Sequence, residues 1–278
     1  MEDSTKIWRY TDLSKFIGLL SRGLHFSRSS ALGDEWEGAW GVKNITRFRE
    51  EYFGRPDEGA AEWNARVAEK GRRLDEVGVS CWHRSECESA ALWDLYMPQG
   101  LGVAVQSTVG RINSATAAID RTVEVLEVCY IDFNKEELPP DPSALLARKR
   151  PEFQHENEVR FLLRFTEDEQ KAIGMLKQAH AERDTRWISL SPVNGGLIRP
   201  GPAIAVMDQT AVDRATPVGV HLRIPAVSIV EKVYLAPKVA QPVRNAVCDV
   251  VEKYGLDLRT ISESSKDMIA PDRLKFFP

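Results

Sequence analysis

Short segments of apolar and aromatic residues recur along the chain as far as residue 261, and amphipathic helical segments separate them. Segments of this length that are rich in β-branched and aromatic residues are typical of strands. The pattern predicts strands at 7–10, 24–27, 78–83, 103–106, 123–131, 153–165, 219–224, 229–235 and 256–261. No low-complexity linker interrupts the series. We therefore expect an α+β fold, in which a mixed, largely antiparallel sheet is flanked by helices.

The same continuity predicts one domain over residues 1–278, with a C-terminal strand–helix–strand unit at about 219–262 packed on it. Side chains that can cap a helix mark where several helices begin. These predicted caps are Thr11 or Asp12, the pair Ser85 and Glu88, and the pair Thr166 and Glu169. Each of the two pairs has the S/T-x-x-E spacing of a capping box.

The charge balance excludes one class of function. A net charge of −4 gives no general basic surface for nonspecific binding of DNA or RNA. One basic stretch stands out, with Arg148, Lys149 and Arg150 followed by Arg160 and Arg164. We interpret this stretch as a solvated face, which is the usual location of charged side chains.

The expected environment is the cytoplasm. Four widely spaced cysteines without a C-x-x-C pair favour free, mostly buried thiols in a reducing compartment: Cys81, Cys87, Cys129 and Cys248. The polar start of the chain does not have the pattern of a signal peptide. No apolar run approaches the length of about 18 residues that a membrane span requires. We therefore expect a soluble, cytoplasmic protein with no membrane partner, while its oligomeric state stays open.

A pair of carboxylates in the segment 153–165 is the first candidate for chemistry. In a strand, Glu156 and Glu158 project from the same face with Cα atoms about 7 Å apart. Two such carboxylates can divide acid, base or electrostatic roles, or hold a cation. The alternative is an exposed strand edge on which both glutamates pair with Arg160 and Arg164.

Arg9 is the second candidate, because it lies between Trp8 and Tyr10 on a short strand that we expect to be largely buried. A guanidinium group in such a place needs an anionic partner. That partner is either a ligand phosphate or a carboxylate of the protein, such as Asp34 or Glu37.

Other side chains with reactive or stacking groups carry less information. Cys81, His83 and Cys87 match none of the common zinc spacings, so we expect small buried thiols and a hydrogen-bonded histidine. Trp93 and Tyr96 share a helix face, which occurs more often in a core than in a stacking platform. The sequence also has no motif typical of Rossmann dehydrogenases, P-loop NTPases, serine hydrolases or zincins.

Together, several of these segments resemble a large bacterial family of domains of unknown function. They are Trp8-Arg9-Tyr10, Asp34-Glu35-Trp36-Glu37-Gly38, Ser80-Cys81-Trp82-His83, the run from Glu88 to Tyr96, and Phe153-Gln154-His155-Glu156-Asn157-Glu158-Val159-Arg160. The resemblance covers nearly the whole chain, although members more often have Asn-Asp-Pro-Phe at 33–36. It implies a working surface built from these segments, and it implies no particular reaction.

The opening strand, the short helix and the Gly-Leu strand after it are similar to the start of ADP-ribosyltransferase domains. This resemblance implies that Arg9 holds NAD and that Glu158 binds the nicotinamide ribose and stabilises its developing positive charge. It assigns the choice of nucleophile to Glu156 and a middle-strand hydroxyl to Ser80 or Ser27.

The resulting hypothesis is an ADP-ribosyltransferase-like protein that cleaves NAD without a metal and passes ADP-ribose to water or to an unknown macromolecule. By analogy, it has a role in bacterial defence or in toxin–antitoxin systems. Besides Glu156 and Glu158, the site residues expected are Arg9, Tyr10, Trp93 and Tyr96 for NAD and Asp34, Glu37 and Arg160 for the substrate. Two alternatives stay open. One is a metal-dependent nuclease that uses Glu156, Glu158 and Asp34, and the other is a non-catalytic module that binds a small anionic ligand.

Overall fold

A computed structural model describes residues 1–52, 56–97, 101–181 and 209–265. The contacts within the chain divide it into two compact units, and each is described by itself. Unit 1 comprises Met1–Gly23, Trp82–Asp120 and Ile224–Pro278, and unit 2 comprises Leu24–Cys81 and Arg121–Arg223. The prediction of one domain over 1–278 stays a prediction. The expected C-terminal unit at 219–262 is divided, since its first strand belongs to unit 2 and the rest to unit 1.

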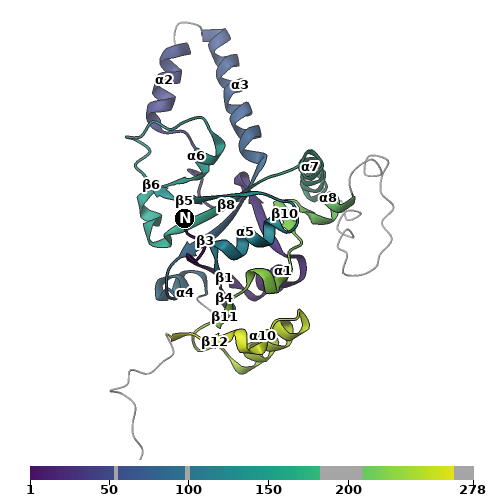
Figure 1. The fold of residues 1–278 in the computed structure, drawn as a ribbon. Coiled ribbons are helices and arrows are strands. Elements are labelled where there is room, and N and C mark those ends of the chain that lie inside the picture. Colours follow the sequence, from purple (N-terminus) through teal and green to yellow (C-terminus); the bar gives the residue numbers. More distant parts are fainter. Residues whose placement is uncertain (53–55, 98–100, 182–208, 266–278) are drawn as a thin grey trace, which may run out of the picture. The chain divides into compact units, whose positions relative to one another are not determined.

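Unit 1 is built on four strands in the order β12-β11-β4-β1 (Figure 1). They are β1 (Lys6–Asp12), β4 (Gly102–Thr108), β11 (Lys232–Leu235) and β12 (Ile261–Glu263). All pairs are antiparallel except β11 with β12. The helices of this unit are α1 (Leu13–Arg22), α4 (Ala90–Tyr96), α5 (Val109–Ala117), α9 (Ala226–Ile229), α10 (Gln241–Lys253) and η6 (Leu258–Thr260).

Strand β3 (Val77–Arg84) is divided between the two units: residues 77–81 belong to unit 2, and residues 82–84 belong to unit 1. Its last residues pair with β1, where Trp8 lies opposite His83. Its first residues pair in unit 2 with β2 (Leu24–Arg28), which pairs in turn with β10 (Gly219–Leu222).

The other strands of unit 2 are β5 (Val123–Glu127), β6 (Cys129–Tyr130), β7 (Arg148–Lys149), β8 (Glu158–Arg164) and β9 (Ala215–Thr216). Strand β8 lies between β3 and β5, while β6 and β7 form a separate parallel pair. The helices are η1 (Ser29–Ala31), α2 (Val42–Tyr52), α3 (Pro56–Asp75), α6 (Pro142–Leu146), η2 (Pro151–Glu156), α7 (Glu167–Ala181) and α8 (Gln209–Arg214).

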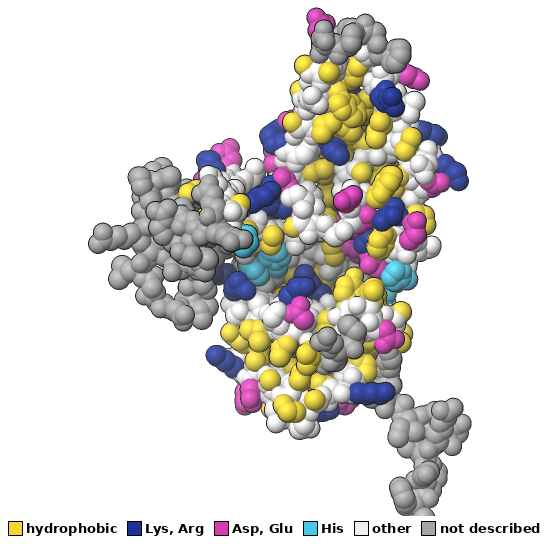
Figure 2. All heavy atoms as spheres, turned by 180° about the vertical axis from the view of Figure 1, so that it is seen from behind, with side chains coloured by type: hydrophobic (Ala, Val, Ile, Leu, Met, Phe, Trp, Pro, Cys, Tyr) yellow, Lys and Arg dark blue, Asp and Glu magenta, His cyan; other side chains and the backbone are white. Residues whose placement is uncertain are grey.

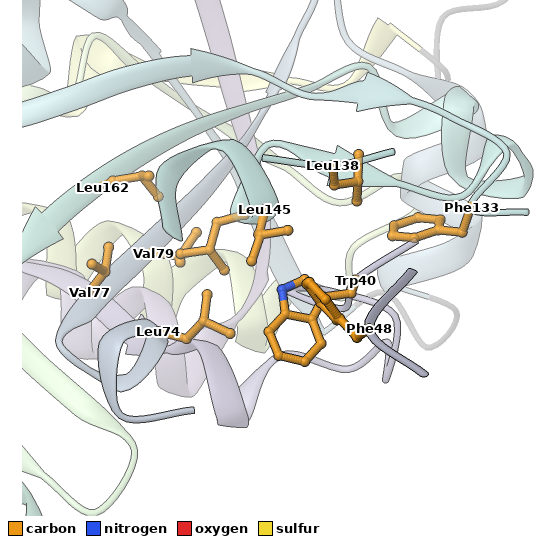
Figure 3. Packing of buried hydrophobic residues seen from close by; sticks show 10 residues of the cluster. Trp40, Phe48, Leu74, Val77, Val79, Phe133, Leu138, Leu145 and Leu162 are labelled. Carbon is orange, nitrogen blue, oxygen red and sulfur yellow. The ribbon is translucent and has the colours of Figure 1, made fainter. Parts of the chain in front are cut away.

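A hydrophobic core in unit 2 includes Phe48 from α2 and Leu74 from α3 (Figure 3). The Trp40 ring packs edge-on against Phe48 at a centroid distance of 5.1 Å, and Leu145 and Leu162 contribute from α6 and β8. Along α2 and α3 the surface carries hydrophobic side chains among both acidic and basic ones, at the top of Figure 2. This surface is therefore not the basic stripe that nonspecific binding of nucleic acid favours.

The predicted fold class is confirmed: the sheet is mixed and largely antiparallel, and helices flank it. The cap of α1 is confirmed as well, because the Asp12 carboxylate accepts a hydrogen bond from the Lys15 amide at 2.8 Å. Gly23 ends that helix with a φ of 87°, a conformation that glycine adopts without steric cost. Thr166 and Glu169 form the predicted capping box at the start of α7.

Several boundaries were predicted wrongly. The expected strand at 123–131 breaks at Val128, where β5 ends and β6 begins. The expected strand at 229–235 starts only at Lys232, since residues 226–229 form α9. Within 256–261, the chain forms the short η6 helix before β12. None of the helices in the described residues combines the length and apolar composition that crossing a bilayer requires.

Candidate functional site

Five charged side chains meet in the interior of unit 2, and we call them the charge network. They are Glu37, Lys149, Glu156, Glu158 and Arg160. They come from the loop before α2, from β7, from the end of η2 and from the first residues of β8. Each side chain is at most 13% exposed, so the ionised groups depend on one another for partners.

Arg160 is the most deeply buried member, with a side chain that is 0% exposed. Its guanidinium group donates two hydrogen bonds to the Glu158 carboxylate, from Nε to Oε1 and from Nη2 to Oε2, and both are 3.0 Å long. The Nη1 atom donates to the Leu146 carbonyl at 2.7 Å, and Nη2 lies 3.0 Å from Oε2 of Glu37. This fork fixes both the position and the orientation of the Glu158 carboxylate.

Lys149 bridges the three carboxylates. Its Nζ lies 2.5 Å from Oε2 of Glu156, 3.2 Å from Oε2 of Glu158 and 3.3 Å from Oε1 of Glu37. The aromatic ring of Phe153 lies over the same ammonium group, with its centroid 4.7 Å from Nζ. An ammonium group with these neighbours stays charged: burial lowers the pKa of Lys149, but the carboxylates, Glu158 above all, outweigh burial and raise it.

The pKa values of Glu158 and Glu37 are shifted in opposite directions. Burial alone would raise the pKa of Glu158, but the charges and hydrogen bonds of Arg160 and Lys149 outweigh it and lower that pKa. For Glu37, burial outweighs the same two cations, and its pKa is raised. Glu158 is therefore held in its ionised form at neutral pH.

The local backbone explains how Glu156 and Glu158 reach the same lysine. The prediction that both lie in one strand over 153–165 is wrong, because β8 begins only at Glu158. Pro151 opens the short helix η2, and Asn157 then takes a left-handed conformation with a φ of 39°. The Glu158 amide is held by the Tyr130 hydroxyl at 2.9 Å. The turn at Asn157, and not the two-residue period of a strand, brings the carboxylates together.

Glu37 is positioned by a compact loop. Asp34 accepts hydrogen bonds from the Arg150 guanidinium at 3.0 and 3.3 Å. It also accepts a hydrogen bond from the Trp36 backbone amide. Gly38 follows with a φ of 76°, and a Cβ atom there would lie 3.0 Å from the Leu74 side chain. Asp34 thus serves to hold the loop that carries Glu37.

The basic stretch is not the solvated face that we predicted. Lys149 and Arg160 are buried in the charge network, whereas Arg164 at the far end of β8 has a side chain that is 71% exposed. The pairing of Glu158 with an arginine is real, but it occurs in the interior and not at an exposed edge. The alternation of charged and apolar residues along β8 suggests one exposed face, but the strand is buried on both faces.

The cysteines are free, as expected, but Cys87 and Cys129 are exposed rather than buried. Cys81 lies on β3 beside Glu158, and burial raises the pKa of its thiol well above the usual range. A thiol in this state is a poor nucleophile. Of the two candidate serines, Ser80 is fully buried, and the Ser27 hydroxyl lies 3.3 Å from Nδ1 of His25.

The predicted NAD-binding residues lie in unit 1. The guanidinium carbon of Arg9 lies 5.7 Å from the centroid of the Trp82 ring. Tyr10 and Trp93 are buried and pack edge-on, with their ring centroids 5.0 Å apart. Tyr96 projects from the same helix, α4, with 47% of its surface exposed. Tyr10 and Trp93 therefore belong to a packed core in this structure, while Tyr96 is open to solvent.

The predicted capping box of Ser85 and Glu88 is wrong. Helix α4 starts five residues after Ser85, and its N-cap is Ser89, whose hydroxyl accepts the Leu92 amide at 3.3 Å. Glu88 is used differently: its carboxylate accepts hydrogen bonds from Trp93 Nε1 at 2.7 Å, from the Ser264 hydroxyl at 2.7 Å and from the Ser265 amide. Through these hydrogen bonds, Glu88 links Ser264 and Ser265 to Trp93 of helix α4.

We expect Glu88→Gln to lower the free energy of unfolding at pH 7 by about 1–2 kcal/mol, because three donors lose a charged acceptor. Burial would raise the pKa of Glu88, but the hydrogen bonds from Ser265, Ser264 and Trp93 lower it. Its contribution is therefore present above the unfolded pKa and is lost as the pH falls through the folded pKa. Urea unfolding at pH 7 and below pH 4 measures the difference.

The control for that substitution is Glu86→Gln, because Glu86 is 82% exposed and pairs only at the surface with Lys6. We expect this variant to change stability by less than about 0.5 kcal/mol at either pH. An equal loss of unfolding free energy in both variants would show that the hydrogen bonds of Glu88 do not stabilise the fold.

Sequence reasoning misses Lys149 in the charge network and, in unit 1, the role of Glu88. Lys149 was grouped with its basic neighbours, although its position seven residues before Glu156 and nine before Glu158 was visible. Glu88 was assigned to a local capping box, and its partners 176 and 177 residues away left no local signal.

No protein-family model and no curated protein matches the chain. The proposed membership of a family of unknown function is therefore unsupported. One solved structure that matches is "Thermus sp. 2.9 DarT in complex with ADP-ribosylated ssDNA". The alignment covers 96% of this chain and 98% of that chain, with 12% identity and a TM-score of 0.34. At this level of similarity, function has to be argued from the chain's own residues.

Proposed function

We propose that the charge network is the catalytic centre of an ADP-ribosyltransferase-like protein that cleaves NAD without a metal. The observation that carries the proposal is the setting of Glu158: Arg160 and Lys149 contact its two oxygens and lower its pKa, which favours the ionised carboxylate. A fixed negative charge that needs no reorganisation is what stabilises a positively charged ribosyl group.

In this reaction the bond between C1 of the ribose and the nicotinamide nitrogen breaks. The bonding electron pair moves to the ring nitrogen, which neutralises the pyridinium and releases nicotinamide. The ribosyl group becomes positively charged, and Glu158 faces that charge. Water or an acceptor hydroxyl then bonds to C1, and Glu156 takes the proton that this nucleophile loses.

The exposure of the side chains indicates where a substrate approaches the network. Glu156 is 13% exposed and Arg150 is 36% exposed, compared with 5% for Glu158. The Phe153 ring lies beside Arg150, with its centroid 5.3 Å from the guanidinium carbon, and 4.7 Å from Nζ of Lys149. We place the pyrophosphate of NAD against Arg150 on this side, and we assign Arg160 and Glu37 to positioning Glu158.

A divalent cation fits this arrangement poorly. To bind Glu158, it would have to compete with Arg160 and Lys149 for the two carboxylate oxygens, and it would add positive charge beside two buried cations. This argument weighs against the nuclease alternative. The assignment of Arg9, Tyr10, Trp93 and Tyr96 to NAD binding is a separate prediction, as are the acceptor and the role in defence.

The test is to incubate the purified chain with NAD and follow nicotinamide release, with EDTA and separately with Mg²⁺. We expect release in both conditions, and an unchanged rate when Arg164, exposed on the same strand, is replaced by methionine. Release that EDTA abolishes would favour metal chemistry. A rise in melting temperature with NAD but no nicotinamide would favour the binding module and contradict the proposal.

A further inference from the structure

The charge network contains more negative than positive groups. Three carboxylates, those of Glu37, Glu156 and Glu158, face two cations, Lys149 and Arg160. The neighbouring Asp34 and Arg150 pair with each other and so add no net charge, and the Cys81 thiol is neutral because its pKa is raised. If all three carboxylates were ionised, an enclosed site would carry one uncompensated negative charge, which is costly.

Glu37 is the carboxylate with the poorest partners. Its Oε2 is buried and makes no hydrogen bond among the described residues, although it lies 3.0 Å from Nη2 of Arg160. Its Oε1 lies 3.3 Å from Nζ of Lys149, the longest of the three contacts of that group. Glu158, in contrast, accepts two aligned hydrogen bonds from Arg160 and a third from Lys149.

We propose that Glu37 is the carboxylate of the network that takes up a proton first as the pH falls, and that it then leaves both cations to Glu158 and Glu156. Burial of Glu37, which raises its pKa, agrees with the charge count. Its value for catalysis, as a positioning residue that keeps Glu158 ionised, rests on the proposed function. Its protonation does not, because it follows from charge and geometry alone.

The proposal fixes the sign of two pH effects. The folded chain holds the Glu37 proton to a higher pH than the unfolded chain does, so Glu37 lowers stability as the pH rises above its unfolded value of about 4.3. Glu158 has the opposite effect, because its folded pKa is lowered. Its contribution is present above the unfolded pKa and is lost as the pH falls.

The experiment compares the melting temperatures of Glu37→Gln, Glu37→Met and Glu158→Gln between pH 5 and pH 9. Both Glu37 variants keep a neutral side chain of similar length, so we expect melting within about 2 °C of the parent at pH 7 and a smaller decline at high pH. For Glu158→Gln we expect a drop of about 8 °C or more at pH 7, because the buried Arg160 loses the carboxylate that accepts two of its hydrogen bonds.

A loss in Glu37→Gln equal to that in Glu158→Gln, or failure of both Glu37 variants to fold, would overturn the proposal. Either result would mean that the negative charge of Glu37 is required. Where nicotinamide release is measurable, its decline at alkaline pH should begin at a higher pH in Glu37→Gln than in the parent. The melting data stand without any activity, so they separate this proposal from the proposed reaction.

Discussion

Replacing Arg160 with methionine is expected to lower the free energy of unfolding by about 3–5 kcal/mol. The substitution removes both hydrogen bonds that fix Glu158 and leaves that carboxylate in the interior with Lys149 as its cation. It also frees the Leu146 carbonyl, a buried acceptor. Methionine fills a similar length without charge, so the loss reports on the missing partner of the carboxylate more than on a cavity. Urea unfolding at pH 7 measures it.

The matched control lies on the same strand. Arg164 is 71% exposed, and its Nη1 lies 3.5 Å from Oε2 of Glu76. We expect Arg164→Met to change stability by less than about 0.5 kcal/mol, as an exposed ion pair does. Similar effects of the two substitutions would mean that the interior pairing of Arg160 contributes no more than a surface contact.

Replacing Lys149 with methionine is the second substitution with a large expected effect, also about 3–5 kcal/mol at pH 7. It removes the ammonium group that three carboxylates share. Lys149 is one of the groups that lower the pKa of Glu158, so without it that pKa should rise, and protonation relieves part of the loss. The difference from the parent should therefore shrink as the pH falls from 7 towards 5.

Lys135→Met is the control for that series, since Lys135 is 81% exposed and pairs with Asp132 at the surface. Its effect on unfolding should be small at every pH tested. If the Lys149 variant lost the same stability at pH 5 as at pH 7, the carboxylates would not be coupled through this lysine.

The sequence located the carboxylate pair but not its surroundings. Glu156, Glu158 and Arg160 stand out in the sequence because charged residues recur inside an apolar segment, and the structure places all three in one network. The expected exposed face is wrong because β8 is buried on both faces, although the charged and apolar residues in its sequence alternate with a period of two. The turn at Asn157 depends on one left-handed residue, which the strand pattern concealed.

Long-range partners limited the prediction in the same way. Asp34 and Glu37 are expected from the sequence as partners of Arg9 or as substrate ligands, but the structure pairs them with Arg150 and Arg160, more than a hundred residues along the chain. A capping box such as that of Thr166 and Glu169 is local, and it was predicted correctly. Interactions between residues that are distant in the sequence can be identified only once the fold is known.

The most direct test of the proposed role of Glu158 is the rate of nicotinamide release from NAD by the parent chain and by Glu158→Gln. The isosteric amide keeps the volume but removes the charge that stabilises the ribosyl group, so we expect a loss of about 10²–10³-fold. Comparison with Arg164→Met controls for handling of the protein. Release at an equal rate by folded Glu158→Gln, or no release by the parent chain, would contradict the role of Glu158 as the catalytic carboxylate.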